Sequence, residues 1–450
     1  MVRYSIQIIK TILSEASGGV PGPGPVPSGM TWIPTTAILY KDGAQYYAKQ
    51  ADETAITNSN NAFTTIQAAL DYIDSVGGGK LSVLEGVYPI TSDVTVPSGE
   101  TYIIEGMGPP DLLASPTTSG GSMWMLEDGA RFIGTGGCSL ITRQMGFGTA
   151  TGDTWTDMAF DFFGAGPATS MLWNSYNCGY SVKGIHPAGS SNNPWDVPTS
   201  AVIGVGSTSG PTGLPFIWDG NRFYDAREDD GGGTNDDNVL FMAQIESLML
   251  SNTYYSVQIP AALTTPRMMA LNPVSWVYIK NFVLYPDNPV STGTYDYQFM
   301  TVGGAKNLLL HNVQLLDTNG YDTAHFFHHG GGTCYIYGQN VFKGEGGDDP
   351  VLPTGDIDNG GVLKFRLDGR GWENGGEAEA SDTDTIAHGL LGDPPIVSGT
   401  VKETDSDYAL NFTSDATNLT VSLYDIVAGA AETVDKTISW YGRYQFDVDT

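Results

Sequence analysis

Apolar residues recur in short runs along most of this chain, and many runs end at glycine or asparagine. Within residues 62–108 an apolar face with helical spacing comes first, formed by Phe63, Ile66, Ala69, Leu70 and Ile73. A glycine run at 77–79 follows, and then short apolar strands end at Gly86, Gly99 and Gly106. This order predicts a helix that caps the open end of a stack of strands.

Similar strands recur later at the spacing of one coil of a solenoid. Asn281, Asn312 and Asn340 lie in apolar runs and are 31 and 28 residues apart. A coil of this length cannot bury its own interior, so stacked coils at about 4.8 Å must close a common core. We expect inward asparagines that bond their equivalents in the coils above and below. Earlier coils are expected at 217–223 and 244–250, with long loops between them.

The helix and first strands resemble the entrance of pectate-lyase-like β-helices. The resemblance lies in Ile66-Gln-Ala-Ala, the glycines at 77–79 and Gly86-Val-Tyr. It implies an all-β fold, a single-stranded right-handed parallel β-helix with an N-terminal capping helix, and it carries no catalytic group. Near the other end, His388-Gly-Leu and Ile438-Ser-Trp-Tyr are similar to the small C-terminal β-sandwich module of viral tail and spike proteins.

These patterns divide the chain into four parts. We expect an N-terminal anchor and Pro/Gly linker at 1–30, an entrance segment at 31–61, the right-handed β-helix at 62–368 and the β-sandwich module at 369–450. The linker Val20-Pro-Gly-Pro-Gly-Pro-Val-Pro lacks most backbone donors and is therefore expected to be extended. A short apolar segment on such a tether is typical of an anchor.

Composition supports a β-rich chain and limits its partners. There are 58 glycines, 25 prolines and 23 tyrosines, and only 16% of residues are charged, against about 25% in average chains. The net charge of −30 arises because Lys plus Arg number 20 against 50 acids. Such a surface repels nucleic acid and anionic membranes, so neither is expected as a partner. It suits an acidic extracellular protein, or alternatively a protein that works at high salt.

Cysteines and hydropathy add two expectations. Cys138, Cys178 and Cys334 are odd in number and far apart, which excludes a disulfide scaffold and favours buried apolar roles. No stretch approaches the roughly 20 apolar residues of a membrane span, and residues 1–13 are too polar for a secretory signal. We therefore expect no membrane insertion.

The densest acidic segment follows an expected strand and supplies the catalytic candidates: Asp225, Glu228, Asp229, Asp236 and Asp237. Two carboxylates about 5–9.5 Å apart can hydrolyse a glycosidic bond. The same Gly- and Asp-rich segment is typical of a solvated turn or of a Ca²⁺ site. The Asn-Thr-Asp, Gly-His-Gly and Arg-Ile-Lys elements of polygalacturonase-type hydrolases are missing, and the arginine base with Ca²⁺-binding acids of pectate lyases is not recognisable either.

Aromatic residues in or near the long loops are candidates for glycan contacts: Trp195, Trp218, Tyr224, Tyr254 and Tyr255. Aromatic faces stack on apolar sugar faces, and neighbouring polar groups fix hydroxyls. The alternative is that these rings pack beneath the loops as part of the core.

Taken together, an anchor, a β-helix and a terminal sandwich resemble a viral tailspike or receptor-binding fibre. The resemblance implies a parallel homotrimer, contacts of the N-terminus with other tail or capsid proteins, and binding of a host surface glycan or glycoprotein for attachment. It places the protein on a virion that is assembled in the host cytoplasm. One alternative is a glycan depolymerase, a hydrolase or lyase on the same scaffold. Another is a host surface or filament protein.

Overall fold

The computed structural model describes the chain between residues 34 and 443, with gaps. The described ranges are 34–110, 120–164, 171–186, 201–207, 215–228, 238–257, 267–286, 298–302, 307–315, 327–329, 333–343, 349–350, 357–359, 362–367, 373–388, 396–403, 407–415 and 417–443. The expected anchor and linker lie outside them. Within these ranges, no helix has the length and apolarity needed to cross a membrane.

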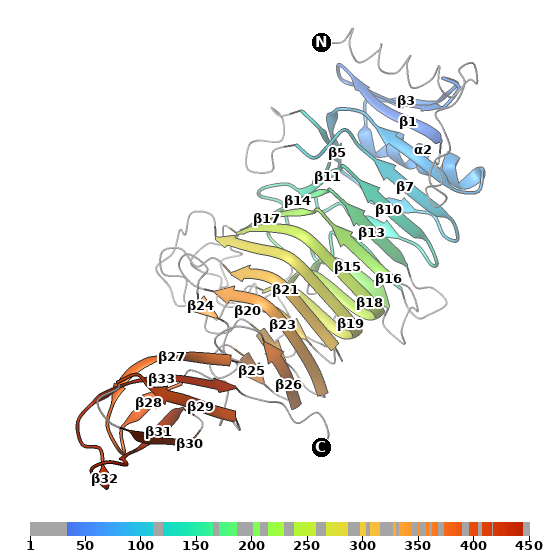
Figure 1. Cartoon of the computed structure of the whole chain (residues 1–450). Coiled ribbons are helices and arrows are strands. Elements are labelled where there is room, and N and C mark those ends of the chain that lie inside the picture. The colour runs from blue at the N-terminus through green and yellow to red at the C-terminus, as the bar shows by residue number, and fades with distance from the viewer. Residues whose placement is uncertain are drawn as a thin grey trace, which may run out of the picture.

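One large sheet forms an elongated shaft that runs from the blue to the orange end of Figure 1. The described strands β1 to β26 belong to this sheet, and most pair in parallel with the strand one coil away. The first column contains β4 (Gly79–Val83), β7 (Thr101–Glu105), β10 (Ser139–Arg143), β13 (Leu172–Tyr176) and β16 (Pro215–Asp219). The second contains β5 (Gly86–Ile90), β8 (Ser122–Leu126), β11 (Gly146–Thr149), β14 (Gly179–Gly184) and β17 (Arg222–Arg227).

The third column contains β6 (Val94–Val96), β9 (Phe132–Gly134), β12 (Phe160–Gly164) and β15 (Ala201–Ser207). The long strands β18 (Asn238–Val257) and β19 (Arg267–Pro286) pass through all three columns. Later coils use β20 (Gln298–Val302), β21 (Asn307–Leu315), β22 (Phe327–His329), β23 (Thr333–Lys343), β24 (Asp349–Pro350), β25 (Ile357–Asn359) and β26 (Val362–Leu367). The predicted single-stranded right-handed β-helix is therefore confirmed, as are the coils expected around Asn281, Asn312 and Asn340, which contain β19, β21 and β23.

The entrance of the shaft is closed by the helix α2 (Ala62–Ser75) and three strands. The side chain of Asn61 begins the helix by accepting a hydrogen bond from the Phe63 N–H at 3.0 Å. The buried face of α2 contains Ile66, Ala69, Leu70 and Ile73, as predicted, while Phe63 is only half-buried. β1 (Thr35–Asp42) pairs with β4 in parallel and with β2 (Gln45–Gln50) antiparallel, and β3 (Ala55–Ser59) pairs with β2. The segment before the helix is thus part of the same sheet.

An asparagine ladder marks the corner between the first and second columns. Asn252, Asn281 and Asn312 have φ values of 50°, 51° and 53°, a left-handed conformation that asparagine tolerates better than most residues. Asn281 Nδ2 donates to Asn252 Oδ1 at 2.9 Å, and Asn312 Nδ2 donates to Asn281 Oδ1 at 3.0 Å. Each amide therefore bonds its equivalent in the next coil, as predicted.

The Asn281 and Asn312 side chains are half-buried and that of Asn252 is exposed, so the ladder lies at the corner rather than fully inside the core as expected. The inward asparagine is Asn221, which is buried and accepts hydrogen bonds from the Cys178 N–H and the Ser175 hydroxyl. The ladder position of that coil is Gly220, with φ 69°, where a Cβ atom would collide with the Asn177 side chain. In this coil the ladder position therefore precedes the asparagine by one residue.

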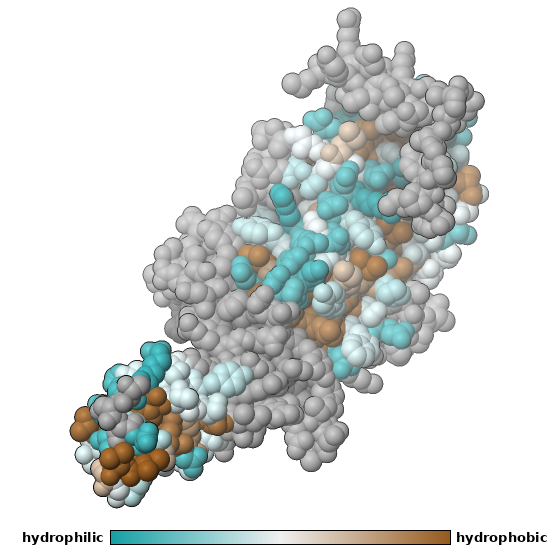
Figure 2. All heavy atoms as spheres, in the orientation of Figure 1, coloured by the Kyte–Doolittle hydropathy of each residue, from teal (hydrophilic) through white to brown (hydrophobic). Residues whose placement is uncertain are grey.

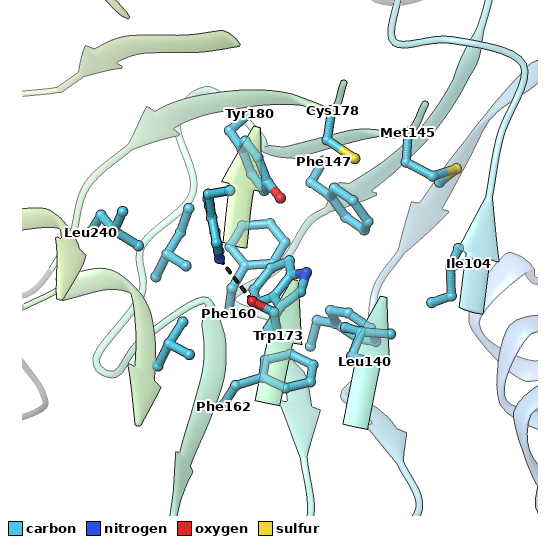
Figure 3. Close-up of a cluster of buried hydrophobic side chains, with 14 of the residues drawn as sticks. Ile104, Leu140, Met145, Phe147, Phe160, Phe162, Trp173, Cys178, Tyr180 and Leu240 are labelled. Carbon is cyan, nitrogen blue, oxygen red and sulfur yellow. Dashed lines mark hydrogen bonds between the residues drawn. The ribbon is translucent and has the colours of Figure 1, made fainter. Parts of the chain in front are cut away.

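Stacked aromatic rings fill the shaft interior (Figure 3). Ring centroids are 5.7 Å apart between Phe147 and Tyr180, 4.9 Å between Tyr180 and Phe223, and 5.3 Å between Phe223 and Tyr255. These residues are directly paired in the parallel register of the second column, so one ring lies on the next. Cys138 and Cys178 are buried free thiols in the same core, as expected.

A separate antiparallel module follows the shaft in the chain and lies beyond its end in Figure 1. One sheet contains β27 (Glu373–Ala380), β33 (Lys436–Arg443) and β29 (Ile396–Val401); the other contains β28 (Thr385–Ala387), β31 (Asn418–Asp425), β30 (Tyr408–Ser414) and β32 (Ala430–Ala431). Both sheets contribute to one small core, which confirms a sandwich. His388 is buried and its Nε2 lies 3.0 Å from the Asp415 carbonyl oxygen, as expected for a histidine that fixes a turn.

Candidate functional site

The acidic segment predicted from the sequence begins inside the shaft. Asp225, on β17, is fully buried and forms an ion pair with Arg227, with Nε to Oδ1 at 2.9 Å and Nη2 to Oδ2 at 3.0 Å. The Tyr255 hydroxyl also donates to Asp225 Oδ2, at 3.2 Å. Asp225 is therefore not a catalytic candidate, because both its oxygens are engaged away from solvent.

Glu228 lies just past the end of β17, at the surface. Both of its carboxylate oxygens accept the Gly152 N–H at 3.0 Å, so this side chain is held against the loop after β11. Three further candidate acids, Asp229, Asp236 and Asp237, lie outside the described residues, and so does Trp195. For these four residues the sequence-based assignment stays a prediction.

Two of the predicted glycan-contacting rings belong to the core instead. Trp218 is fully buried, with its Nε1 donating to the Trp173 carbonyl at 2.8 Å, and Tyr255 is 2% exposed in the aromatic stack. A buried ring has no free face for a sugar, so this part of the prediction is corrected. Tyr224 is largely covered, with the Lys183 amino group 5.5 Å from its ring centroid, whereas Tyr254 is 41% exposed.

Glu228 lies near other acids that were not predicted from the sequence. Strands β8, β11, β14 and β17 follow one another in the second column and end at the same edge, and the turns after β8 and β11 carry Glu127, Asp128 and Asp153. The Asp128 N–H donates to Asp153 Oδ2 at 2.9 Å, and Gly152 beside it donates to Glu228. We call Glu127, Asp128, Asp153 and Glu228 the carboxylate cluster.

The acids of the carboxylate cluster influence one another electrostatically. Partial burial, reinforced by the charges of Asp153 and Asp128, raises the pKa of Glu127. A carboxyl group whose pKa is raised can keep its proton and so is suited to act as a general acid. Within the described ranges, no group of three or more acid, His or Cys side chains is arranged to hold a metal ion.

Behind this edge lies a buried histidine. His186 stacks on Trp155, with ring centroids 5.0 Å apart, and its Nε2 lies 2.8 Å from the Lys183 carbonyl oxygen. Burial, together with the nearby positive charge of Arg227, lowers the pKa of His186 to about 3. The imidazole is therefore neutral at pH 7 and serves to hold the loop of Trp155 in place.

A sequence signal for the carboxylate cluster exists, although it is weak. Asp128-Gly129 and Gly152-Asp153 are turn dipeptides that come shortly after apolar strands. Because parallel strands one coil apart end at one edge, acids in such turns come together even when they are 25 or more residues apart. The acidic run at 225–238 differs from these turns only in its higher density of acids.

No family model and no curated protein matches the chain. Among solved structures, it is similar to the tailspike protein gp49 of Acinetobacter baumannii bacteriophage Fri1, a capsular polysaccharide depolymerase, with 12% identity and a TM-score of 0.30 over 84% of this chain and 82% of that chain. It is also similar to the tailspike gp61 of Pseudomonas phage phi297, with 8% identity and a TM-score of 0.28 over 85% and 92% of the two chains. A mutant tailspike of E. coli bacteriophage HK620, in complex with a pentasaccharide, gives 9% identity and a TM-score of 0.25 over 86% and 90%. Phage tailspikes are thus among the structures that this chain resembles, and at these identities the likeness concerns the fold.

Proposed function

We propose that this protein is a virion attachment protein of the tailspike type, which binds a host cell-surface glycan. The observation that supports this most is the shaft, a continuous stack of coils from Thr35 to Leu367 that ends in a separate sandwich. Solenoids of this kind offer long, stiff lateral surfaces on which an extended polymer can lie across several coils. The strongly acidic chain also avoids adhering to anionic membranes and nucleic acid.

The proposal includes three copies in parallel and an N-terminal connection to other tail or capsid proteins. Three equivalent binding faces on one particle would give avidity far above the affinity of one face, because the second and third contacts form at high effective concentration. Mass photometry of the full-length protein tests the assembly, since a trimer has three times the 47.9 kDa mass of the chain.

A binding experiment tests attachment directly. The full-length protein is passed over immobilised polysaccharides, a panel of acidic and neutral polymers from bacterial and archaeal surfaces, and retention is recorded at two salt concentrations. We expect retention on a subset of the panel and a loss of retention when soluble polymer of the same type is added. Failure to bind any surface polymer would contradict the attachment role.

The carboxylate cluster supports a second candidate function, cleavage of the bound glycan. In that case Glu127, whose pKa is raised, would donate a proton to the glycosidic oxygen, and Asp153 would act as the second carboxylate of the pair. Glycosidases of both stereochemical types use a carboxyl pair in this way, and no metal is needed.

Release of oligosaccharide separates the two candidates. We expect the wild type to release fragments, detected by mass spectrometry, if it is a depolymerase, and the Glu127→Gln and Asp153→Asn variants to lose at least 100-fold in rate. Asp71→Asn is the matched control, because it removes one carboxylate on α2, far along the chain from the cluster. Binding without release in the wild type would leave attachment as the function.

A further inference from the structure

One outer face of the shaft presents aromatic side chains and a lysine and contains no acid. Three neighbouring coils each contribute three alternating residues to the first column, and the register pairs them one above another. Val277 and Ile279 between the outward residues of β19 are fully buried, as alternation on a strand requires. The nine positions of this sheet face are Ser247, Met249, Ser251, Trp276, Tyr278, Lys280, Asn307, Leu309 and His311, of which Ser251 is buried.

The middle strand presents an aromatic pair to solvent. Trp276 is 54% exposed and Tyr278, two residues further along the same side of β19, is half-buried. Two residues of strand separate their attachment points by about 6.6 Å. Met249, below Tyr278 in the register, is 38% exposed. Figure 2 shows hydrophobic side chains at the surface in the region of β18 and β19, with hydrophilic ones beside them.

Hydrogen-bonding groups surround the Trp276 indole. Ser247 and Asn307 are its register neighbours in the coils on either side, about 4.8 Å away along the sheet. A ring that stacks on a sugar, flanked by a hydroxyl and an amide that meet the sugar hydroxyls, is a suitable recognition arrangement for a carbohydrate. β19 is paired on both sides over this stretch, so the platform is stiff.

The charge of the face determines which carbohydrate fits. None of the nine positions is Asp or Glu, although the chain has 50 acids, and Lys280 and His311 are direct register neighbours. No ion pair of Lys280 occurs within the part of the chain that the structure describes. The acid of the preceding coil, Asp219, is engaged by the Ser251 hydroxyl and the Asn252 amide, both at 2.7 Å. Within these nine positions an anionic polymer therefore meets positive rather than negative charge.

We propose that this sheet face binds a carboxylate-bearing polysaccharide, with its sugar rings stacked on Trp276 and Tyr278 and a carboxylate beside Lys280 and His311. The inference rests on the proposed attachment function and names its binding site and the charge class of its glycan. It differs from the sequence-based choice of Trp218 and Tyr255, which are core residues.

Binding of the full-length protein to alginate, a uronic acid polymer, and to neutral dextran tests this site alongside the attachment panel. We expect preference for acidic polymers, at least tenfold weaker binding for Trp276→Ala, and near-normal binding for Trp276→Phe, which keeps a stacking face. Lys280→Gln should reduce the preference for acidic polymers several-fold and weaken its salt dependence. Tyr424→Ala, which removes a ring 45% exposed in the sandwich module, is the control and should bind normally.

The outcomes separate this site from the attachment function itself. A wild type that binds only neutral polymers, or a Trp276→Ala variant that binds acidic ones normally, overturns the site while attachment stands. A wild type that binds nothing on the panel or in this assay overturns both. If Trp276→Ala instead lowers the assembly mass in mass photometry, the face is an interface between copies of the chain and the glycan site is wrong.

Discussion

In the shaft, Phe223 lies between Tyr180 and Tyr255 and is 3% exposed, whereas Phe412 in the sandwich module packs on its core and remains half-buried. Both residues lie on strands of an all-β structure. The shaft buries a ring by placing an equivalent ring above and below it, one coil away in each direction. The module has only the two faces of a small sandwich, and its buried cluster contains seven residues in the described part.

The difference teaches that stability in this chain depends on stacking more than on strand content. In a solenoid each coil contributes an interface to both neighbours, so burial accumulates along the axis. A sandwich of about 70 residues has a large surface for its volume and leaves part of its apolar side chains accessible. We therefore expect the shaft to tolerate substitutions of interior residues less well than the module.

The largest expected effect on stability comes from truncating Phe223 in the shaft, compared with Phe412 in the module. Phe223→Ala should lower the free energy of unfolding of the shaft by about 3–5 kcal/mol, since it opens a cavity in the stack. Phe412→Ala should cost only about 1 kcal/mol, because the ring is already partly in water. Calorimetry of the full-length variants measures both. Equal losses would refute the comparison.

Loss of the buried ion pair in the shaft should lower the free energy of unfolding nearly as much as Phe223→Ala. Asp225→Ala removes the carboxylate that two Arg227 nitrogens contact and leaves a buried guanidinium, which is expected to cost about 3–5 kcal/mol. In the module the pair of Lys402 and Glu377 is exposed, and Glu377→Ala should change stability by less than about 1 kcal/mol. Chemical denaturation of both variants checks the contrast.

Acid should weaken the shaft through His186. The folded-state pKa is depressed to about 3 from an ordinary value of 6.5, so the unfolded chain binds the extra proton. The stability contributed by the neutral imidazole is fully present above pH 6.5 and is lost as the pH falls from 6.5 towards 3, at up to about 1.4 kcal/mol per pH unit. His186→Phe keeps the stacking on Trp155 and should reduce this slope. An unchanged slope in pH-dependent denaturation would exclude His186 as its source.

Substitutions of turn residues should have the smallest effect on stability. Asn281→Ala removes two ladder hydrogen bonds between coils and places alanine at φ 51°, which should cost about 1–2 kcal/mol. Asn281→Gly should cost less, because glycine accepts this conformation. In the module, Asp425→Ala removes bonds to the Val427 and Ala428 N–H groups within one turn. In hydrogen exchange, Asn281→Ala should lower the protection of backbone amides across neighbouring coils. Asp425→Ala should lower it only within its own turn.

The fold was largely predictable because it follows from local patterns. The spacing of Ile66, Ala69, Leu70 and Ile73 and the asparagines one coil apart specify a cap and a stack without knowledge of any contact. The candidate site was not predictable to the same degree. Trp218 and Tyr255 were assigned to a binding surface because they lie near the expected long loops, although strand alternation places them inside. Glu127 and Asp153 were missed because the turn dipeptides beside them do not show which turns lie at the same edge of the sheet.

The sequence by itself determined the class of fold, the capping helix, the repeat and the excess of negative charge, because each depends on residue order or composition within one coil. Only the tertiary structure decided which side of each strand faces inward, which acids share an edge, and that Trp276, Tyr278, Lys280 and His311 share one face. The physical reason is register. Contacts across stacked strands depend on which residue lies above which, and a shift of one residue moves every side chain to the opposite side of the sheet.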